Sequence, residues 1–304
     1  MAFVHFVVVP APGGSLNQYV LALLLGIVEG VTEFLPVSST AHLRICEALL
    51  GISLGDGFWK MFSIVIQLGA VLCLPIYFRD KIAKFLSTFP RGEHGDRNAL
   101  THPLTLTLIA FVFTAGPAFL LTKIIGKHLE SLRIMALSLI IGGVIMWLVD
   151  WLYEKGRLAM QPIDHMERMS LGQAVWVGIC QILSAVFPGT SRSMATIAAG
   201  QVAGMSRTAA LEFSFFLSMP TMAAATLYDL LKAIHPHHGE PSALGSVHMT
   251  AQLWITLGIG FVVSFLVAYA VVAWFMAWVR TRGFIPFAIY RILAGAGVWW
   301  WMVR

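Results

Sequence analysis

Six apolar stretches, each about as long as the 20 residues that a bilayer-spanning helix needs, constrain the fold of this chain most. The 304 residues are 58% hydrophobic and only 12% charged, against roughly 45–50% and 25% in soluble domains. This balance excludes a soluble globule, a disordered chain and a disulfide-knit secreted domain, and it predicts an all-α polytopic membrane protein. The six stretches are Phe58–Phe78, Pro103–Thr122, Leu132–Leu152, Thr208–Leu231, Ala251–Phe275 and Ile285–Met302.

Two further apolar stretches, Tyr19–Leu50 and Leu171–Ala203, carry Gly, Pro, hydroxyl and ionisable residues at their centres. They are too broken for simple spans and too apolar for loops. They also resemble one another at a constant spacing of 152 positions, which pairs Gly26 with Gly178, Pro36 with Pro188 and Ser39 with Ser191. We therefore predict one membrane domain over 1–304 that contains two repeat halves, approximately 17–153 and 170–303, with a helix break at each proline.

The distribution of Lys and Arg predicts how the chain crosses the membrane. Segments 79–102, 154–169 and 276–284 are basic, whereas the alternate loops 123–131 and 232–250 hold three lysines between them. The basic segments should be cytoplasmic, which places both termini outside. Each broken stretch must then enter and leave on one face, and the two enter from opposite faces, as in an inverted-topology repeat. The scattered basic residues, with a net charge of +5, form no stripe that would bind nucleic acid.

Reactive side chains gather at the two breaks. Glu29 and Glu33 share one helical face, and carboxylates inside an apolar segment are costly without a function or a partner. Arginine with hydroxyls and free helix amides suits phosphate oxygens, and paired carboxylates suit a divalent cation. The sequence thus predicts phosphoryl chemistry or anion transport. The residues after the breaks are Ser38, Ser39, Thr40 and His42, and then Thr190, Ser191, Arg192, Ser193 and Thr196.

Other polar residues of the apolar segments have weaker interpretations. Gln67 and Glu212 lie inside predicted spans, and we expect them to line the cavity or support the site. Residues nearer the predicted helix ends are expected at the membrane interface; these are Glu47, Asp150, Asp229 and Arg291. The histidines of the polar segment 235–248 are not expected to bind metal; they are His235, His237 and His238.

The runs E-G-V-T-E-F-L-P-V-S-S-T-A-H at 29–42 and P-G-T-S-R-S-M-A-T at 188–196 resemble the two signatures of bacterial undecaprenyl-diphosphate phosphatases of the bacitracin-resistance type. The resemblance implies six transmembrane helices plus two re-entrant helix pairs in an inverted repeat. It implies hydrolysis of undecaprenyl diphosphate in the inner membrane, at a site that opens to the outer, periplasmic face. It also implies Mg or Ca as cofactor, with a polyprenyl diphosphate and membrane lipids as partners and a homodimer as one possible assembly. Ala41 and Met194 stand where the family usually has Gly.

The resemblance places the family's functional residues on both breaks of this chain. Glu29 and Glu33 would bind the cation or manage protons, and Arg192 would neutralise the phosphate. Ser39 is the favoured nucleophile with His42 as its base, while His42 itself or a water stays open as the attacking group. Phosphate oxygens would be positioned by Ser38, Thr40, Ser191, Ser193 and Thr196.

Three other functions compete with this one. A transporter or flippase of the lipid carrier would use the same inverted repeat and cavity. A lipid phosphatase of another class would need a Lys-Arg-Pro and a Ser-Gly-His arrangement, which the sequence lacks. An intramembrane protease with a dyad of Ser39 and His42 would leave Arg192 and the glutamates unexplained.

Overall fold

The structure, a computed structural model, describes residues 17–53, 56–121, 131–158, 161–234 and 249–304. Within these residues the chain forms eleven α-helices and one short 3₁₀ helix, with a single isolated β-bridge between Ile163 and Met205 and no strand. The prediction of an all-α protein is therefore confirmed. Several residues considered in the sequence lie outside the described part, namely the segment before Asn17, Lys123, Lys127, His235, His237 and His238.

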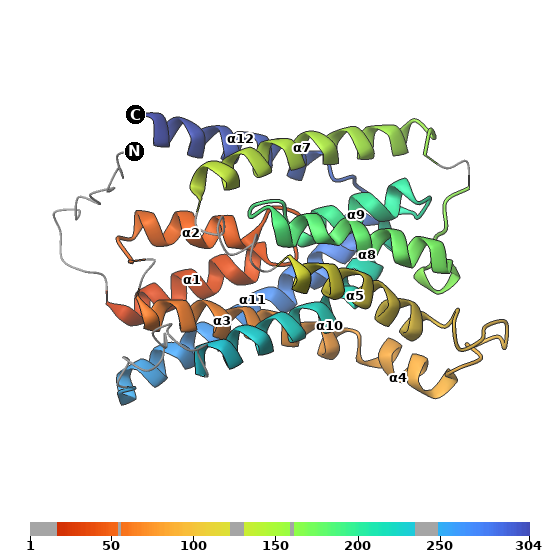
Figure 1. The fold of residues 1–304 in the computed structure, drawn as a ribbon, viewed down its shortest axis with the longest axis horizontal. Helices are drawn as coiled ribbons and strands as arrows, with labels where there is room; N and C mark the ends of the chain where they lie inside the picture. Colours follow the sequence, from red (N-terminus) through yellow and green to blue (C-terminus); the bar gives the residue numbers. More distant parts are fainter. Residues whose placement is uncertain (1–16, 54–55, 122–130, 159–160, 235–248) are drawn as a thin grey trace.

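Five helices are long and apolar enough to cross a membrane: α3 (Gly57–Tyr77), α5 (Pro103–Leu120), α7 (Leu132–Glu154), α10 (Arg207–Ile234) and α11 (Ala251–Val279) (Figure 1). The sixth predicted span forms α12 (Ile285–Val303), which is helical but is not one of these five. The exposed side of α7 is a stripe of Leu137, Ile141, Val144 and Leu148 at helical spacing. Such an outer surface suits a lipid environment.

Each broken stretch folds into two helices, and each break lies where a proline predicted it. The first stretch gives α1 (Gln18–Thr32) and α2 (Ser39–Leu49), and the second gives α8 (Leu171–Val186) and α9 (Arg192–Val202). The residues that cap α2 and α9, Ser38 and Ser191, have φ values of 74° and 69°, a left-handed conformation that is uncommon for residues other than glycine. Ser191 thus occupies the position of Ser38, one residue away from the pairing that the sequence spacing suggests.

The two helix pairs lie toward opposite ends of the molecule (Figure 1). α1 packs along α11, and α8 packs along α5, while α7 packs on α12 and α3 on α10. Glycines allow the first two contacts to be close: a Cβ on Gly26 would lie 2.9 Å from the carbonyl oxygen of Gly260, and one on Gly178 would lie 2.4 Å from that of Ala110. This packing brings the two breaks together in the middle of the molecule.

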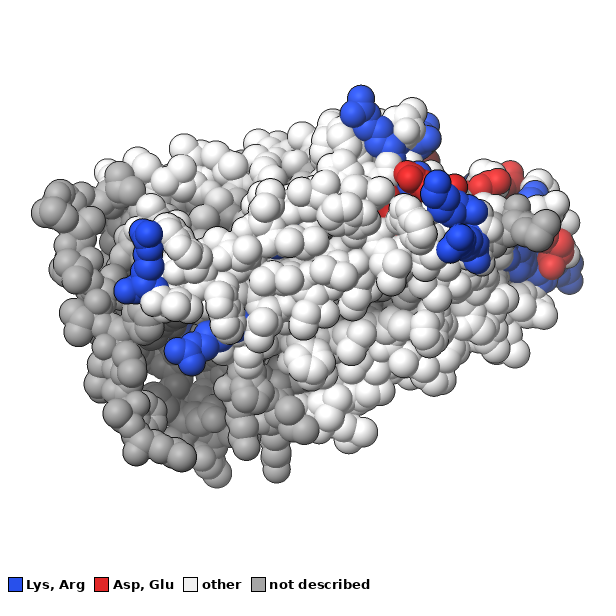
Figure 2. Space-filling view, turned by 90° about the horizontal axis from the view of Figure 1, so that it is seen from above, with Lys and Arg blue, Asp and Glu red and all other residues white. Residues whose placement is uncertain are grey.

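Most charged side chains on the face seen in Figure 2 gather at one end, a few Lys or Arg side chains lie toward the other end, and uncharged residues cover the middle. The charged end includes α4 (Arg79–Thr88) and the 3₁₀ helix η1 (Met166–Arg168). There Asp150 is fully buried, and it accepts hydrogen bonds from the Arg207 side chain at 2.7 Å, from Gln201 at 3.2 Å and from the backbone N–H of Phe284 at 2.7 Å. Asp150 therefore ties four helix ends together and is buried inside the protein, while its predicted position at the membrane interface stays a prediction.

Two more residues expected at the interface are buried. Glu47 is 2% exposed and accepts hydrogen bonds from Arg44 and Ser63, and Arg291 is 0% exposed. Asp229 is exposed. A position near a helix end does not reveal which neighbouring helix covers a residue, so the burial of Asp150, Glu47 and Arg291 could not be predicted.

Candidate active site

A cavity of about 530 Å³ lies where the two breaks meet. One part of its wall is polar and comes from both breaks, with additional residues from α3 and α8. The other part is apolar and comes mainly from α5 and α10. The polar lining is Glu33, Ser38, Ser39, Thr40, Gln67, Gln181, Ser184, Ser191 and Arg192, and the apolar lining includes Phe111, Phe119, Met222 and Tyr228.

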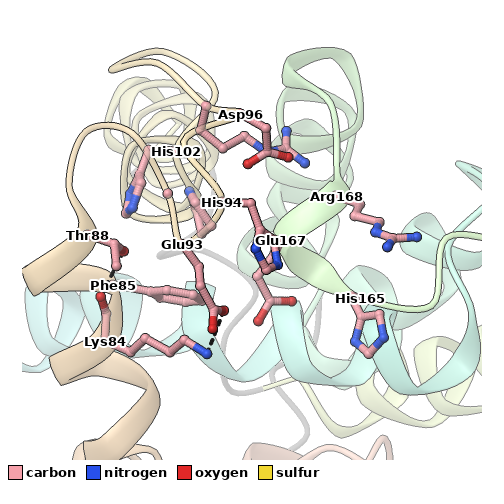
Figure 3. A pocket seen from close by; sticks show the side chains of 13 residues that line it. Lys84, Phe85, Thr88, Glu93, His94, Asp96, His102, His165, Glu167 and Arg168 are labelled. Carbon is pink, nitrogen blue, oxygen red and sulfur yellow. Dashed lines mark hydrogen bonds and ion pairs between the residues drawn. The ribbon is translucent and has the colours of Figure 1, made fainter.

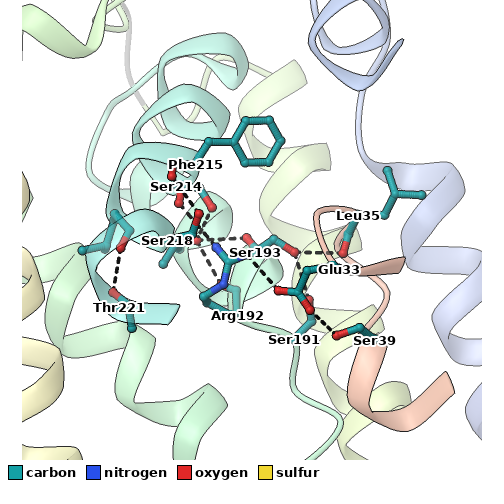
Figure 4. Close-up of polar contacts among 12 residues, drawn as sticks. Glu33, Leu35, Ser39, Ser191, Arg192, Ser193, Ser214, Phe215, Ser218 and Thr221 are labelled. Atoms are coloured by element: carbon teal, nitrogen blue, oxygen red, sulfur yellow. Dashed lines mark hydrogen bonds and ion pairs between the residues drawn. The ribbon is translucent and has the colours of Figure 1, made fainter. Parts of the chain in front are cut away.

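Glu33 of the first break forms an ion pair with Arg192 of the second break (Figure 4). It lies at the C-terminus of α1 and is 7% exposed. Its Oε2 accepts a hydrogen bond from Ser39 Oγ at 2.5 Å, and its Oε1 accepts one from Arg192 Nη2 at 3.3 Å. The Glu33 carboxylate is thus held between a hydroxyl donor on one oxygen and a guanidinium on the other.

Arg192, the first residue of α9, is held from three sides. Besides Glu33, its Nη1 donates to the carbonyl oxygen of Ser214 at 3.4 Å, and its guanidinium lies 5.9 Å from the centre of the Phe34 ring. Its Nε is buried and has no hydrogen-bond partner among the described residues. Ser214 was not among the predicted site residues, although Ser214 and Ser218 are four residues apart and so place two hydroxyls on one face of α10.

The predicted phosphate-binding residues divide into two groups. Ser38, Thr40 and Ser191 line the cavity. Ser193 and Thr196 instead brace the second break: Ser193 Oγ donates to the carbonyl oxygen of Leu35 at 2.9 Å, and Thr196 Oγ1 lies 2.6 Å from Ser214 Oγ.

His42 is held away from Ser39. Its Nδ1 lies 2.7 Å from the carbonyl oxygen of Ser38, and its Nε2 lies 2.6 Å from the hydroxyl of Tyr290. A carbonyl oxygen only accepts, so Nδ1 carries the proton and Nε2 accepts from Tyr290. The hydrogen bond of the Ser39 hydroxyl goes to Glu33 instead of this histidine.

Glu29 is a candidate cation ligand by its chemistry and surroundings. It is 1% exposed, and neither carboxylate oxygen has a hydrogen-bond partner in the described part of the chain. It precedes Glu33 by one helical turn, so the pair offers hard oxygen donors of the kind that Mg²⁺ and Ca²⁺ prefer. No group of three or more His, Cys, Asp or Glu residues that could hold a metal occurs among the described residues. Glu29 and Glu33 would give a cation two protein ligands, and phosphate or water would have to supply the others.

The two residues expected to line the cavity have different outcomes. Gln67 lines it from α3, as predicted. Glu212 does not: it pairs with Lys81 at 2.7 Å, and Lys81 also pairs with Glu167 at 2.6 Å, which draws Glu212 into the charged end.

The chain matches the family model described as bacitracin resistance protein BacA over residues 22–297. The chain belongs to this family. The matched range contains both breaks and all of the cavity-lining residues named above. The chain is also 68% identical over 290 residues to the undecaprenyl-diphosphatase of Koribacter versatilis strain Ellin345, covering 95% of this chain and 100% of the relative.

Relatives with lower identity to this chain are also named undecaprenyl-diphosphatase. The undecaprenyl-diphosphatase of Caldanaerobacter subterraneus subsp. tengcongensis is 40% identical over 92% of this chain and 95% of its own length. That of Persephonella marina is 39% identical over 90% of this chain and 95% of its own length. These matches confirm the resemblance found in the two motifs, and they give no support to the transporter hypothesis.

A second pocket, of about 400 Å³, lies at the charged end and contains neither BacA motif (Figure 3). Within it, Lys84 and Glu93 form an ion pair at 2.5 Å. The hydrogen bond from Lys84 lowers the pKa of the Glu93 carboxyl, and burial together with the charge of Arg97 lowers the pKa of His102. The pocket between the two breaks is therefore the candidate active site.

Proposed function

We propose that the chain hydrolyses undecaprenyl diphosphate to undecaprenyl phosphate and inorganic phosphate. This reaction recycles the lipid carrier for peptidoglycan synthesis and gives resistance to bacitracin. The observation that carries the proposal is the contact of Ser39, Glu33 and Arg192 in one cavity. A hydroxyl nucleophile, an acceptor for its proton and a cation for the phosphate are the groups that phosphoryl transfer requires.

The cavity walls suit the two parts of the substrate. The diphosphate would lie against the polar wall, where Arg192 and the N-terminal amides of α2 and α9 attract oxyanions. The first isoprene units would lie against Phe111, Phe119 and Met222, because apolar surface favours a hydrocarbon chain.

In the proposed chemistry, Ser39 Oγ forms a bond to the terminal phosphorus, and the bond from that phosphorus to the bridging oxygen breaks. The Ser39 proton moves to Glu33 and from there to the departing undecaprenyl phosphate. A water then attacks the phosphoserine, and its proton reaches Oγ through Glu33 as inorganic phosphate leaves. Arg192 neutralises charge on the phosphoryl oxygens in both steps. Such stabilisation commonly raises kcat by a factor of about 10²–10³.

A divalent cation, Mg or Ca, is part of the proposal. Glu29 and Glu33 would hold it, and it would supply positive charge to the phosphate oxygens. The unpartnered, buried carboxylate of Glu29 supports this assignment.

The proposed topology has α12 as a sixth span, the pairs α1–α2 and α8–α9 as re-entrant segments, and an inverted repeat. The matching partners of α1 and α8, which are α11 and α5, support it. The protein would lie in the inner membrane with the cavity open to the periplasm. The apolar lining from Phe119 and Tyr228 lies in the C-terminal halves of α5 and α10, away from the basic segments. A homodimer stays a prediction.

Phosphate release from a long-chain prenyl diphosphate by purified protein tests the activity. Wild type should release phosphate, and a chelator should stop it until Mg²⁺ or Ca²⁺ is restored. Ser39→Ala should lower the rate by about a thousandfold or more, because it removes the nucleophile. Thr107→Val is a matched control, since the buried Thr107 hydroxyl bonds only to the Pro103 carbonyl of its own helix. Folded wild type without release under any cation would overturn the proposal.

Labelling of single cysteines tests the orientation. In a variant without Cys46, Cys73 and Cys180, the exposed residues Gln18 and Asp96 are changed to Cys one at a time. In intact cells an impermeant maleimide should label Gln18→Cys, while Asp96→Cys should react only after lysis. The reverse pattern would place the cavity opening on the cytoplasmic face.

A further inference from the structure

Arg291, on α12, is a buried arginine whose hydrogen bonds to the described residues all go to backbone carbonyl oxygens. It is 0% exposed, and the described residues form no salt bridge with it. Its Nη1 donates to the carbonyl oxygen of Pro36 at 2.9 Å, and its Nη2 lies 3.0 Å from the carbonyl oxygens of Gly189 and Thr190 and 3.1 Å from that of Ser138. A buried cation is costly, so these bonds are the compensation that keeps it there.

Three of the four carbonyls that Arg291 binds belong to the breaks, and the fourth, that of Ser138, belongs to α7. Pro36 lies two residues before Ser38, and Gly189 and Thr190 lie directly before Ser191. Ser38 and Ser191 are the two cap residues with positive φ. One guanidinium on α12 therefore joins the two breaks from behind, at the points where the chain turns to start α2 and α9.

The orientation of these peptide groups determines which way the next backbone N–H groups point. A trans peptide is planar, so its N–H points opposite to its C=O. With the Thr190 carbonyl turned to Arg291, the N–H of Ser191 points away from Arg291. Ser39 and Arg192, the first residues of α2 and α9, follow immediately and line the cavity. Arg291 itself does not line it.

The neighbouring helix is shaped around this guanidinium. A Cβ on Gly142 of α7 would lie 2.4 Å from Arg291 Nη2. Glycine at this position leaves the space that the guanidinium needs to reach all four carbonyls.

We propose that Arg291 is a positioning residue of the phosphatase: it holds the backbone of both breaks and so fixes Ser39 of one opposite Arg192 of the other. The inference rests on the proposed function for its kinetic consequence. A displacement of about 1 Å between reacting groups can lower the reaction rate about a hundredfold. Removal of the guanidinium should therefore slow the chemical step and leave substrate binding nearly intact.

The kinetic experiment compares kcat and KM, per folded molecule, for phosphate release from a prenyl diphosphate. Arg291→Met keeps the side-chain length and should lower kcat about a hundredfold, with KM within about threefold of wild type. Arg291→Lys retains the charge and some hydrogen-bond donors, so its kcat should be about tenfold higher than that of Arg291→Met. Gly142→Ala, which displaces the guanidinium, should lower kcat about tenfold.

Gly295→Ala is the matched control, because it disturbs the same contact of α7 and α12 one turn farther along. Its Cβ would lie 2.7 Å from the carbonyl oxygen of Ala136 and does not reach the guanidinium. It should keep kcat per folded molecule within about threefold of wild type. A loss in Gly295→Ala equal to that in Arg291→Met would assign Arg291 a general packing role and overturn the proposal.

A double-mutant cycle separates positioning from loss of folded protein. If Arg291 acts through Arg192, then adding Arg291→Met to Arg192→Ala should lower kcat by less than about threefold more. Effects that multiply fully would contradict the proposal.

Hydrogen exchange measures the anchoring without any activity. In Arg291→Met, the amides of residues 33–39 and 187–192 should exchange about tenfold faster or more, while those of α5 stay unchanged. Equal exchange in wild type and variant would overturn the anchoring role. If wild type released no phosphate, the proposed function would fail while this measurement still decided the role of Arg291.

Discussion

At the scale of single residues, the site depends on the position of Glu33 between a hydroxyl and a guanidinium. Ser39 Oγ and Arg192 Nη2 bind different oxygens of the same carboxylate. Glu33 Oε2 already receives the hydrogen of the Ser39 hydroxyl, so it lies where it could take that proton, while Oε1 faces Arg192. In the proposed reaction, the phosphate gives Arg192 a second anion to bind, so this contact would connect substrate binding with activation of Ser39.

The residues of the two motifs could be predicted, because carboxylates, hydroxyls and an arginine at helix breaks are costly without a function. Their partners could not. Arg291 is 255 positions from Pro36, and Tyr290 is 248 positions from His42. Contacts of that separation depend on how α12 packs on the rest of the molecule. His42 therefore looked like a base for Ser39, although its nitrogens are bound elsewhere, and Glu212 looked like a cavity residue until Lys81 was placed beside it.

At the scale of helices, proline and glycine carry most of the predictive information. Pro36 and Pro188 located both breaks, because proline removes a helix hydrogen bond and restricts the residue before it. The spacing of Gly26 and Gly178 indicated a repeat, and each glycine proves to be a close contact with a partner helix. The exact register after each break could not be predicted, since the left-handed conformation falls on Ser38 and Ser191 and no glycine marks it.

The close contact of α8 with α5 predicts a stability effect. Gly178→Ala would place a Cβ 2.4 Å from the Ala110 carbonyl oxygen, so the helices must separate, and unfolding should become easier by about 1–3 kcal/mol. Thermal unfolding in detergent would show a lower Tm. Gly116→Ala, on α5, has no atom within 4 Å of its Cβ and should leave Tm unchanged or slightly higher. Equal Tm values for Gly178→Ala and wild type would show that α8 does not depend on this contact.

At the scale of the whole molecule, the active site exists only because two halves of the chain meet. Ser193 of the second break donates to Leu35 of the first, Arg192 pairs with Glu33, and Arg291 binds both. In the proposed mechanism, neither break alone supplies the nucleophile, its proton acceptor and the cation that binds phosphate. The number of apolar stretches predicted the class of fold, but the cavity between the breaks follows from packing that no single segment determines.

The most direct test of this joint site is the rate of phosphate release by Glu33→Gln, by Arg192→Ala and by the double variant. Each single variant should lose about a hundredfold or more. Because the two residues act as a unit, the double variant should be at most about tenfold slower than the worse single variant. Wild-type rates in either folded single variant, or losses that multiply fully in the double variant, would contradict a catalytic centre shared by the two breaks.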